Sequence, residues 1–289
     1  MKNRTLFVFA ILLLVMLQSC KFSKLLKSGS VEEKYEAAVK LYQEKDYSRA
    51  LQLFDQLIGV MRATDKAEKI YYYYAYSYYN QKDYTLASYY FKRFSNNFPS
   101  SPDAEECLFM SAYCNYLSSP DYNLDQTNTF EAIKELQLFT NMYPGSKRVP
   151  ECNDLIDKLR VKLEMKDYRI ARLYYRMDEY GAAIQTLNNI LKEFPESQHK
   201  EEILFLVFKS YHKFAMESIH EKKKERHTKA LASYNEFIAQ YPESEFFNEA
   251  KGLKEKSRLE LETLYKKDQN KLNLQNQKSQ SIQPKSNGL

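Results

Sequence analysis

Few residues of this 289-residue chain have the types and spacing that catalysis requires. Its six glycines lie so far apart that no G-x-G nucleotide turn, P-loop or G-x-S-x-G nucleophile elbow can be written. The histidines, His199, His212, His220 and His227, lie in one charged stretch where we expect solvated side chains, and no His or Cys cluster has metal-ligand spacing. Because no nucleophile–base pair or paired carboxylate site stands out, we predict no catalytic and no metal-binding residues.

Cys20 is the residue with a specific covalent chemistry. Lys2 and Arg4 precede an uncharged apolar stretch, residues 5–17, and the sequence Leu-Gln-Ser-Cys then ends at Cys20. A stretch of this length is too short to span a bilayer, and its pattern is typical of a bacterial lipoprotein signal. We therefore predict a signal peptide over residues 1–19 and acyl chains, palmitate among them, on Cys20. More than one chain is needed for lasting membrane attachment.

The residues after Cys20 are basic and short, so residues 20–30 are interpreted as a lipidated tether. Lys21 rather than Asp follows the cysteine, which by similarity to known lipoproteins indicates passage to the outer membrane. No acidic run follows, so we expect the protein to face the periplasm.

The other three cysteines are an odd number in an oxidising compartment, which allows one disulfide at most. If Cys107 and Cys114 share a helix, their seven-residue spacing places them roughly 10 Å apart, too far for a bridge. We expect Cys107, Cys114 and Cys152 to be buried small apolar side chains.

Four short strings recur along the body of the chain and divide it into repeats. Each has an aromatic residue, then proline, then a serine two positions later: they occupy residues 98–101, 143–146, 194–197 and 241–244. A small residue stands twelve positions before each proline, and a large apolar or aromatic residue follows it by one helical turn. The small residues are Ala87, Ala132, Ala183 and Ala230, and the large residues are Phe91, Leu136, Leu187 and Tyr234.

This register resembles the tetratricopeptide repeat (TPR), a pair of helices that cannot bury its apolar face alone and stacks on its neighbours. The resemblance implies an all-α fold, a right-handed superhelix of about five helix-turn-helix repeats over residues 31–265. The expected repeats are residues 31–64, 68–101, 105–146, 164–197 and 203–244, followed by a capping helix at residues 246–265 and a disordered polar tail at 266–289. Repeats three and five each carry about eight extra residues, a loop in repeat three and a solvated helical extension in repeat five.

Tyrosine is abundant, with 25 residues beside 17 Phe and no Trp. Seven tyrosines lie between Tyr71 and Tyr79, and the repeat frame assigns three of them to a concave groove. We predict an aromatic groove for an extended or β-prone peptide segment; the alternative is that these rings only fill an aromatic-rich solenoid. The groove candidates are Tyr35, Tyr42, Tyr72, Tyr76, Tyr79, Phe109, Tyr113 and Tyr116.

The fourth and fifth repeats place a basic and aromatic face at the corresponding positions. Such a face suits an acidic protein surface, although a solvated helix face with extended Lys and Arg side chains is an equal alternative for each residue. The candidates for a partner surface are Arg172, Arg176, Lys209, His212 and Lys213.

The acylated cysteine, the tether and the five repeats together resemble the BamD family, the TPR lipoproteins of the outer membrane BAM complex. The resemblance implies a non-catalytic scaffold that binds the periplasmic POTRA domains of BamA through its C-terminal repeats. It also implies that the N-terminal repeats bind the aromatic-ended strand of unfolded outer-membrane proteins. No cofactor beyond the covalent lipid is expected.

Two other classes of protein share these features in part. A periplasmic TPR scaffold for another envelope complex, in division or motility, would have every repeat feature. A glycan-binding lipoprotein of the SusD type is usually larger and uses Trp for sugar stacking, which this chain lacks. The net charge of +5 carries no strong nucleic-acid footprint, so no nucleic-acid partner is expected.

Overall fold

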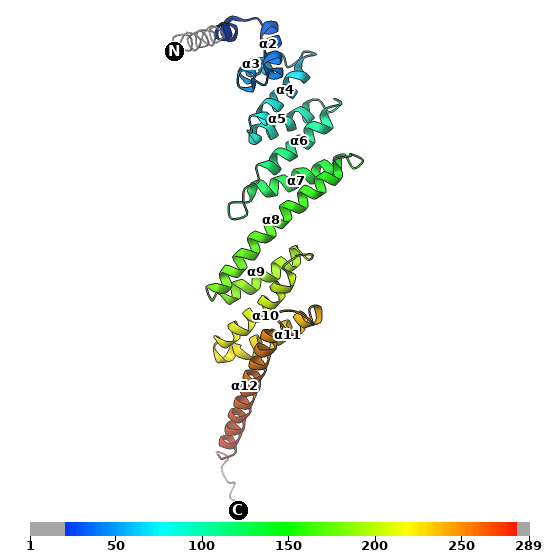
Figure 1. Cartoon of the computed structure of the whole chain (residues 1–289). Coiled ribbons are helices and arrows are strands. Elements are labelled where there is room, and N and C mark those ends of the chain that lie inside the picture. The colour runs from blue at the N-terminus through cyan, green and yellow to red at the C-terminus, as the bar shows by residue number, and fades with distance from the viewer. Residues whose placement is uncertain (1–20, 282–289) are drawn as a thin grey trace, which may run out of the picture. The chain divides into compact units, whose positions relative to one another are not determined.

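The structure, a computed structural model, describes residues 21–281, with side chains to residue 277, and within that range all regular elements are helices (Figure 1). The predicted signal peptide, Cys20 and residues 282–289 lie outside the described residues. No helix in the described part of the chain combines the length and the apolarity needed to cross a bilayer. The helices are α2 (Val31–Gln43), α3 (Tyr47–Val60), α4 (Ala67–Asn80), α5 (Tyr84–Asn97), α6 (Ala104–Leu117), α7 (Thr127–Met142), α8 (Val149–Arg176), α9 (Tyr180–Glu193), α10 (Lys200–Met216), α11 (His220–Gln240) and α12 (Phe247–Ser281).

The chain forms two compact units, the first ending at Arg160 and the second beginning at Val161. In the first unit the helix pairs α2/α3, α4/α5 and α6/α7 make three repeats. In the second unit the C-terminal half of α8 packs with α9 in one hydrophobic cluster, α10 pairs with α11, and α12 packs on the last pair. This is the all-α TPR fold that the repeat register predicts.

The repeat register also predicts which residues form the core. The four alanines twelve positions before the prolines are completely buried, as are Phe91, Leu136 and Leu187 one turn later. Small side chains let two helices approach closely, and the large residue fills the space one turn away. The twelve-residue spacing therefore marks the packed face of the second helix in each repeat.

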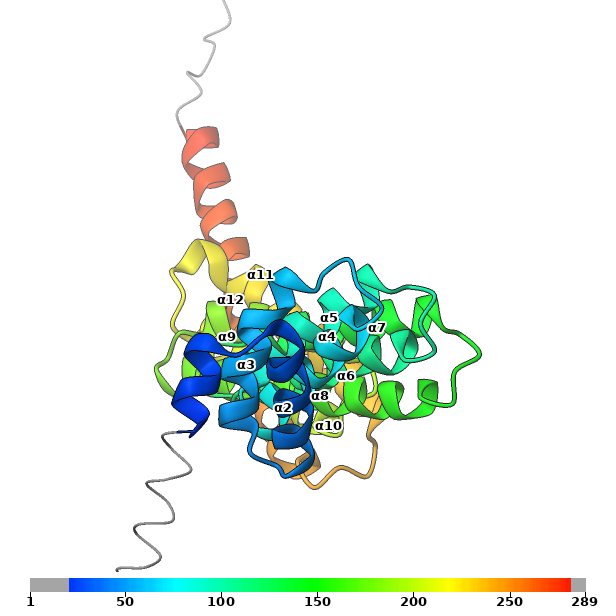
Figure 2. The ribbon, with the colours of Figure 1, turned by 90° about the horizontal axis from the view of Figure 1, so that it is seen from above.

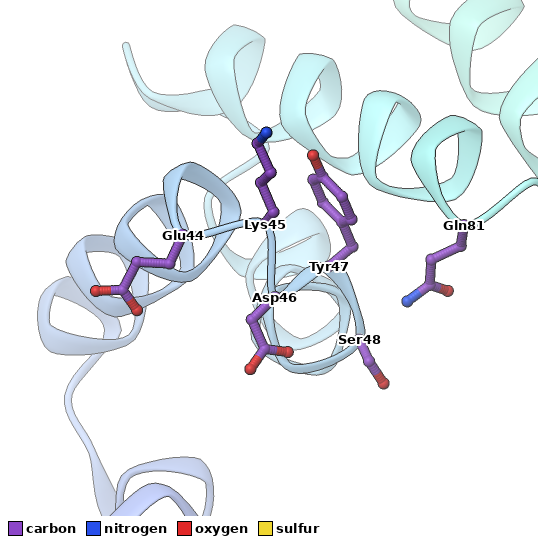
Figure 3. A pocket seen from close by; sticks show the side chains of 6 residues that line it. All are labelled: Glu44, Lys45, Asp46, Tyr47, Ser48 and Gln81. Atoms are coloured by element: carbon purple, nitrogen blue, oxygen red, sulfur yellow. The ribbon is translucent and has the colours of Figure 1, made fainter.

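A tight turn joins the two helices of a repeat at three places. Lys45, Lys82 and Asp178 each have a positive φ, between 61° and 63°, which lets the backbone reverse after the first helix. At the first two turns the next residue caps the second helix: the Asp46 and Asp83 carboxylates accept the N–H groups of Arg49 and Leu86. Figure 3 shows the first of these turns beside an open hollow of about 460 Å³ that reaches Gln81 at the end of α4. Asp46 also pairs with the Arg49 guanidinium, so its carboxylate is committed to the turn.

The serine of the recurring strings connects the two ends of a repeat. Ser101, Ser146 and Ser197 each donate a hydrogen bond to a glutamate in the first helix of the same repeat, with an O–O distance of 2.5 Å in all three. The acceptors are Glu68, Glu105 and Glu164. Each serine also accepts the backbone N–H two residues later. The serine of the recurring strings is thus explained by a structural hydrogen bond within the repeat.

The fifth repeat lacks this contact and provides an internal comparison. Ser244 accepts the Phe246 N–H at 3.1 Å, but the residue 41 positions earlier, the offset that links Ser146 to Glu105, is the buried Ile203. Ser244 therefore has no carboxylate partner within residues 21–277.

We expect Ser197→Ala to lower the free energy of unfolding of the second unit by about 1–3 kcal/mol, because Glu164 would remain buried without its donor. Ser244→Ala removes only the bond to a backbone N–H and should cost at most about 1 kcal/mol. Urea unfolding monitored by hydrogen exchange of α9 and α11 measures both. Equal losses in the two variants would show that the serine–glutamate bond adds nothing.

The two insertions have the expected structure: that of repeat three is a loop before α7, and that of repeat five lengthens α11. Three other segments differ from their predicted boundaries. Helix α8 runs without a break from Val149 to Arg176, through the predicted start of repeat four at residue 164. Residues 266–281, expected to be disordered, continue α12. Residues 21–28, expected to be a tether, form a helix.

Candidate binding surfaces

The tyrosine-rich segment is the helix α4, and its residues divide between core and surface. Tyr71 and Tyr74 are buried, whereas Tyr72, Tyr76 and Tyr79 are half-buried. The ring centroids of Tyr72 and Tyr76 lie 4.6 Å apart and those of Tyr76 and Tyr79 6.3 Å apart. These three side chains form a row along the helix because they are spaced three and four residues apart.

A second row lies on α6. The rings of Phe109 and Tyr113 stack with centroids 5.8 Å apart, and those of Tyr113 and Tyr116 stack at 5.9 Å. Tyr113 and Tyr116 are half-buried, but Phe109 is 2% exposed. Phe109 therefore packs against Tyr113 inside the protein and offers no surface to a ligand, contrary to the expectation for a groove residue.

Both rows pack on one hydrophobic core in the first unit. Burial raises the pKa of Tyr79, and the neighbouring Tyr113 raises it further. Burial likewise raises the pKa values of Tyr72 and Tyr76, so all these hydroxyls stay protonated donors at neutral pH. We call the half-buried members of the two rows the tyrosine face: Tyr72, Tyr76, Tyr79, Tyr113 and Tyr116.

The two remaining candidates, on α2, are half-buried and have other contacts. The Lys66 ammonium lies 4.7 Å from the centroid of the Tyr35 ring. The Tyr42 ring lies 4.6 Å from that of Tyr73, and burial raises the pKa of Tyr42 to about 12. Tyr73 in turn touches the Tyr72 ring at 5.9 Å. Tyr42 is thus connected to the tyrosine face through one intervening ring.

An ion-pair group at the start of α8 was not foreseen from the sequence. The Arg148 guanidinium makes two hydrogen bonds to Glu106, at 2.8 and 2.9 Å, and another to Glu151 at 2.9 Å. The Cζ atom of this guanidinium lies 4.3 Å from the centroid of the Phe109 ring, so Arg148 covers that ring. The 42-residue separation of Arg148 from Glu106 gives no local signal for this pairing.

The predicted partner surface of the second unit is only partly basic. Arg172 lies 3.9 Å from a Glu202 carboxylate oxygen, and Lys209 is ion-paired with Glu249 at 2.6 Å. Arg172 also lies over the Tyr168 ring, and Lys209 over the Tyr175 and Phe205 rings. Their charges are therefore already compensated. Arg176 and Lys213 are exposed and form no ion pair among the described residues.

His212 does not belong to a partner surface, because it is 4% exposed. Its Nδ1 lies 2.7 Å from the Ser257 hydroxyl, and Nδ1 of the fully buried His227 lies 3.3 Å from the same hydroxyl. The expectation of solvated histidines is wrong for these two. The charged residues around them in the sequence lie on other faces of α10 and α11.

The structure also locates the cysteines and tests for metal ligands. Cys107, Cys114 and Cys152 are free and buried, as expected. Burial raises the pKa of Cys114 to about 12 and that of Cys152 to about 11, so these thiols are neutral and unreactive at pH 7. Within the described residues no group of three or more His, Cys, Asp or Glu side chains could hold a metal ion.

Comparison with known proteins identifies the relatives of this chain. The model of the family described as YfiO, outer membrane lipoprotein, matches residues 27–227, and a tetratricopeptide repeat model matches residues 218–244. The outer membrane protein assembly factor BamD of Rickettsia prowazekii is 23% identical over 75% of this chain and 82% of its own length. The BamD proteins of Neisseria meningitidis serogroup A and Pasteurella multocida are 24% and 22% identical, over 67% and 76% of this chain and 76% and 88% of their own lengths.

Among solved structures, a kinesin light chain protein with TPR-like repeats from Podosopora anserina aligns with 83% of this chain and 96% of its own. Its TM-score is 0.30 and its identity 12%, so this likeness adds nothing to the family assignment.

Proposed function

Because this chain belongs to the YfiO family of outer membrane lipoproteins, the family of the assembly factor BamD, we propose that it is a non-catalytic scaffold of β-barrel assembly. In this role it is anchored through acyl chains on Cys20, faces the periplasm, and binds both BamA and unfolded outer-membrane proteins. The tyrosine face is the observation that carries the client-binding part of this proposal.

The spacing of the tyrosine rings supports an extended ligand. Alternate residues of a β-strand project to the same side at intervals of roughly 6.6 Å, and successive rings on the two rows lie between 4.6 and 6.3 Å apart. An extended segment lying along α4 can therefore place side chains of one face against successive rings. The protonated hydroxyls can donate hydrogen bonds to its backbone carbonyls.

The proposed mechanism needs no bond to be made or broken. An unfolded barrel protein exposes unpaired strand edges, which aggregate. A surface that holds one such segment lowers the concentration of free edges. Attachment to the membrane keeps the bound client near the site of insertion and so raises its effective concentration there.

The proposed BamA contact rests on the exposed cations of the second unit. Arg176 and Lys213 are the candidates whose charges are not compensated by ion pairs in the described part of the chain. An acidic surface on a POTRA domain would complement them.

We expect Arg176→Glu with Lys213→Glu to reduce co-purification of BamA from native membranes by roughly tenfold or more, because each reversal replaces attraction by repulsion. Lys192→Glu with Lys251→Glu, two exposed lysines of the same unit, is the matched control and should leave recovery unchanged. If BamA is absent from purifications of the unmodified protein, the chain serves a different envelope complex.

A further inference from the structure

The helix formed by residues 21–28 is packed on the first repeat. Phe22, Leu25 and Leu26 contact the core between α2, α3 and α4, and the Arg49 guanidinium lies 5.7 Å from the centroid of the Phe22 ring. Figure 2 shows this short helix, in dark blue, beside α2 and α3. The segment is therefore an ordered part of the first unit.

The turn after this helix requires glycine. The Gly29 N–H donates to the Leu25 carbonyl at 2.9 Å. A Cβ at Gly29 would lie 2.6 Å from that oxygen and 2.7 Å from Leu25 Cδ1, closer than side chains approach. Ser30 then starts α2 with a capping box formed with Glu33. The geometry of the turn holds the apolar side of the helix against the repeat.

The opposite side of the helix is basic. At about 100° per residue, the three apolar side chains fall within one arc, whereas the three lysines fall on the other side. Lys21, Lys24 and Lys27 are exposed, and none forms an ion pair with any residue in the described range. A hollow of about 310 Å³ beside the helix is lined by Lys21, Lys24 and Glu33. The Glu33 carboxylate already accepts a hydrogen bond from the Ser30 backbone N–H.

We infer that this lysine face binds the anionic phospholipids of the membrane to which the chain is attached. The inference rests on the proposed acylation of Cys20, which directly precedes the helix and would hold it at the bilayer. Phosphate headgroups complement three unpaired ammonium groups on one side of a helix. Because the helix is packed on α2 and α3, such binding fixes the first repeat at the membrane surface.

The test is amine footprinting of the full chain in native envelope vesicles and, after purification from the envelope, in two kinds of reconstituted vesicle. One contains phosphatidylglycerol and phosphatidylethanolamine at 1:2, and the other phosphatidylcholine alone. Mass spectrometry reports the labelling of each lysine and, from the same digest, whether Cys20 carries acyl chains. Three exposed lysines elsewhere, Lys147, Lys192 and Lys251, are the internal controls.

We expect Lys21, Lys24 and Lys27 to be labelled at least roughly threefold more slowly in the anionic vesicles, since three lysines near an anionic surface favour association by about a hundredfold. The control lysines should be labelled equally in both kinds of vesicle. Salt at about 0.5 M should remove the difference in labelling of Lys21, Lys24 and Lys27, because it screens charge interactions at the surface. Lipid binding should also slow hydrogen exchange of the Ser23 and Ser28 amides in the anionic vesicles, and Gln substitutions at the three lysines should abolish this slowing.

Equal labelling of the three lysines in both vesicles would overturn the inference, whatever the state of Cys20. Protection in native envelope vesicles but in neither lipid mixture would also overturn it, and would indicate a protein occupant. An unmodified Cys20 together with protection in anionic vesicles would refute the proposed anchor but support lipid binding by the helix.

Discussion

Replacing Tyr72, Tyr76 and Tyr79 together by alanine is expected to weaken the binding of an unfolded outer-membrane protein segment by roughly a hundredfold. Each ring contributes about 1 kcal/mol of contact with a ligand, and three of them contribute about 3 kcal/mol. The three side chains form one row on α4, so the variant removes three of the five rings of the tyrosine face. Fluorescence anisotropy with a labelled peptide that ends in an aromatic strand measures the change in Kd.

Two further variants separate binding from folding. Phenylalanine at the same three positions keeps the rings and removes only the hydroxyls, so we expect a loss of about tenfold or less. Alanine at Tyr89, Tyr122 and Tyr265, all exposed and outside the tyrosine face, removes the same number of rings and should leave Kd unchanged. Unchanged affinity in the first variant, with helicity intact by circular dichroism, would refute the role of the tyrosine face.

The repeat architecture was predictable because its signals are local. The small residue, the large residue one turn later and the proline all lie within one helix and its end, where spacing alone determines which face they share. The same frame gives packing positions to Tyr71, Tyr74 and Tyr78; Tyr71 and Tyr74 are buried, whereas Tyr78 is half-buried like the row on α4. Within one helix, periodicity therefore assigns most residues to the correct face.

Helix ends were less predictable. After Pro150 in its first turn, α8 contains no proline or glycine, so nothing in its sequence ends the helix at the repeat boundary. In α12, ion pairs such as Arg258–Glu262 at consecutive turns support the helix. Residues 266–281 are rich in Gln, Asn and Lys, a composition that resembles that of disordered segments, but they contain no proline or glycine that would end the helix.

The site residues that depended on distant contacts could not be assigned from sequence. Phe109 occupies the same face as Tyr113, but Arg148, in the turn before α8, covers it. His212 stands among charged residues in the sequence, yet its neighbours in space are His227 and Ser257 from two other helices. Local periodicity contains no information about which helix covers a given face.

The buried histidines give the second large effect, a loss of stability of α12 in acid. Burial lowers the pKa of His212 to about 4, and His227, Lys213 and Lys256 lower it while Glu260 opposes them. Burial also lowers the pKa of His227, with Glu260 opposing and Lys223 adding to the effect. Ser257 of α12 lies between the two rings, so a charge on either ring disturbs the contact that holds α12.

The sign of this pH dependence follows from whether the folded or the unfolded state binds protons more tightly. In the unfolded chain these histidines titrate near pH 6.5, whereas in the folded protein His212 stays neutral down to about pH 4. Stability is therefore complete above about pH 6.5 and is lost as the pH falls toward 4, because the unfolded state takes up protons first. For His212 alone the loss is about 2 kcal/mol at pH 5, and His227 adds to it in the same direction.

Hydrogen exchange of α12, corrected for its intrinsic pH dependence, should show this loss between pH 7 and pH 5, while α4 in the first unit serves as the reference. Replacing His212 and His227 by glutamine removes both titrating groups, so the free energy of α12 opening should become nearly independent of pH even if it is lower throughout. His220→Gln, at an exposed histidine paired with Asp268, should keep the loss seen in the unmodified protein. A loss of equal size in the double variant would mean that other groups destabilise α12 in acid, and that the two buried rings do not control its attachment.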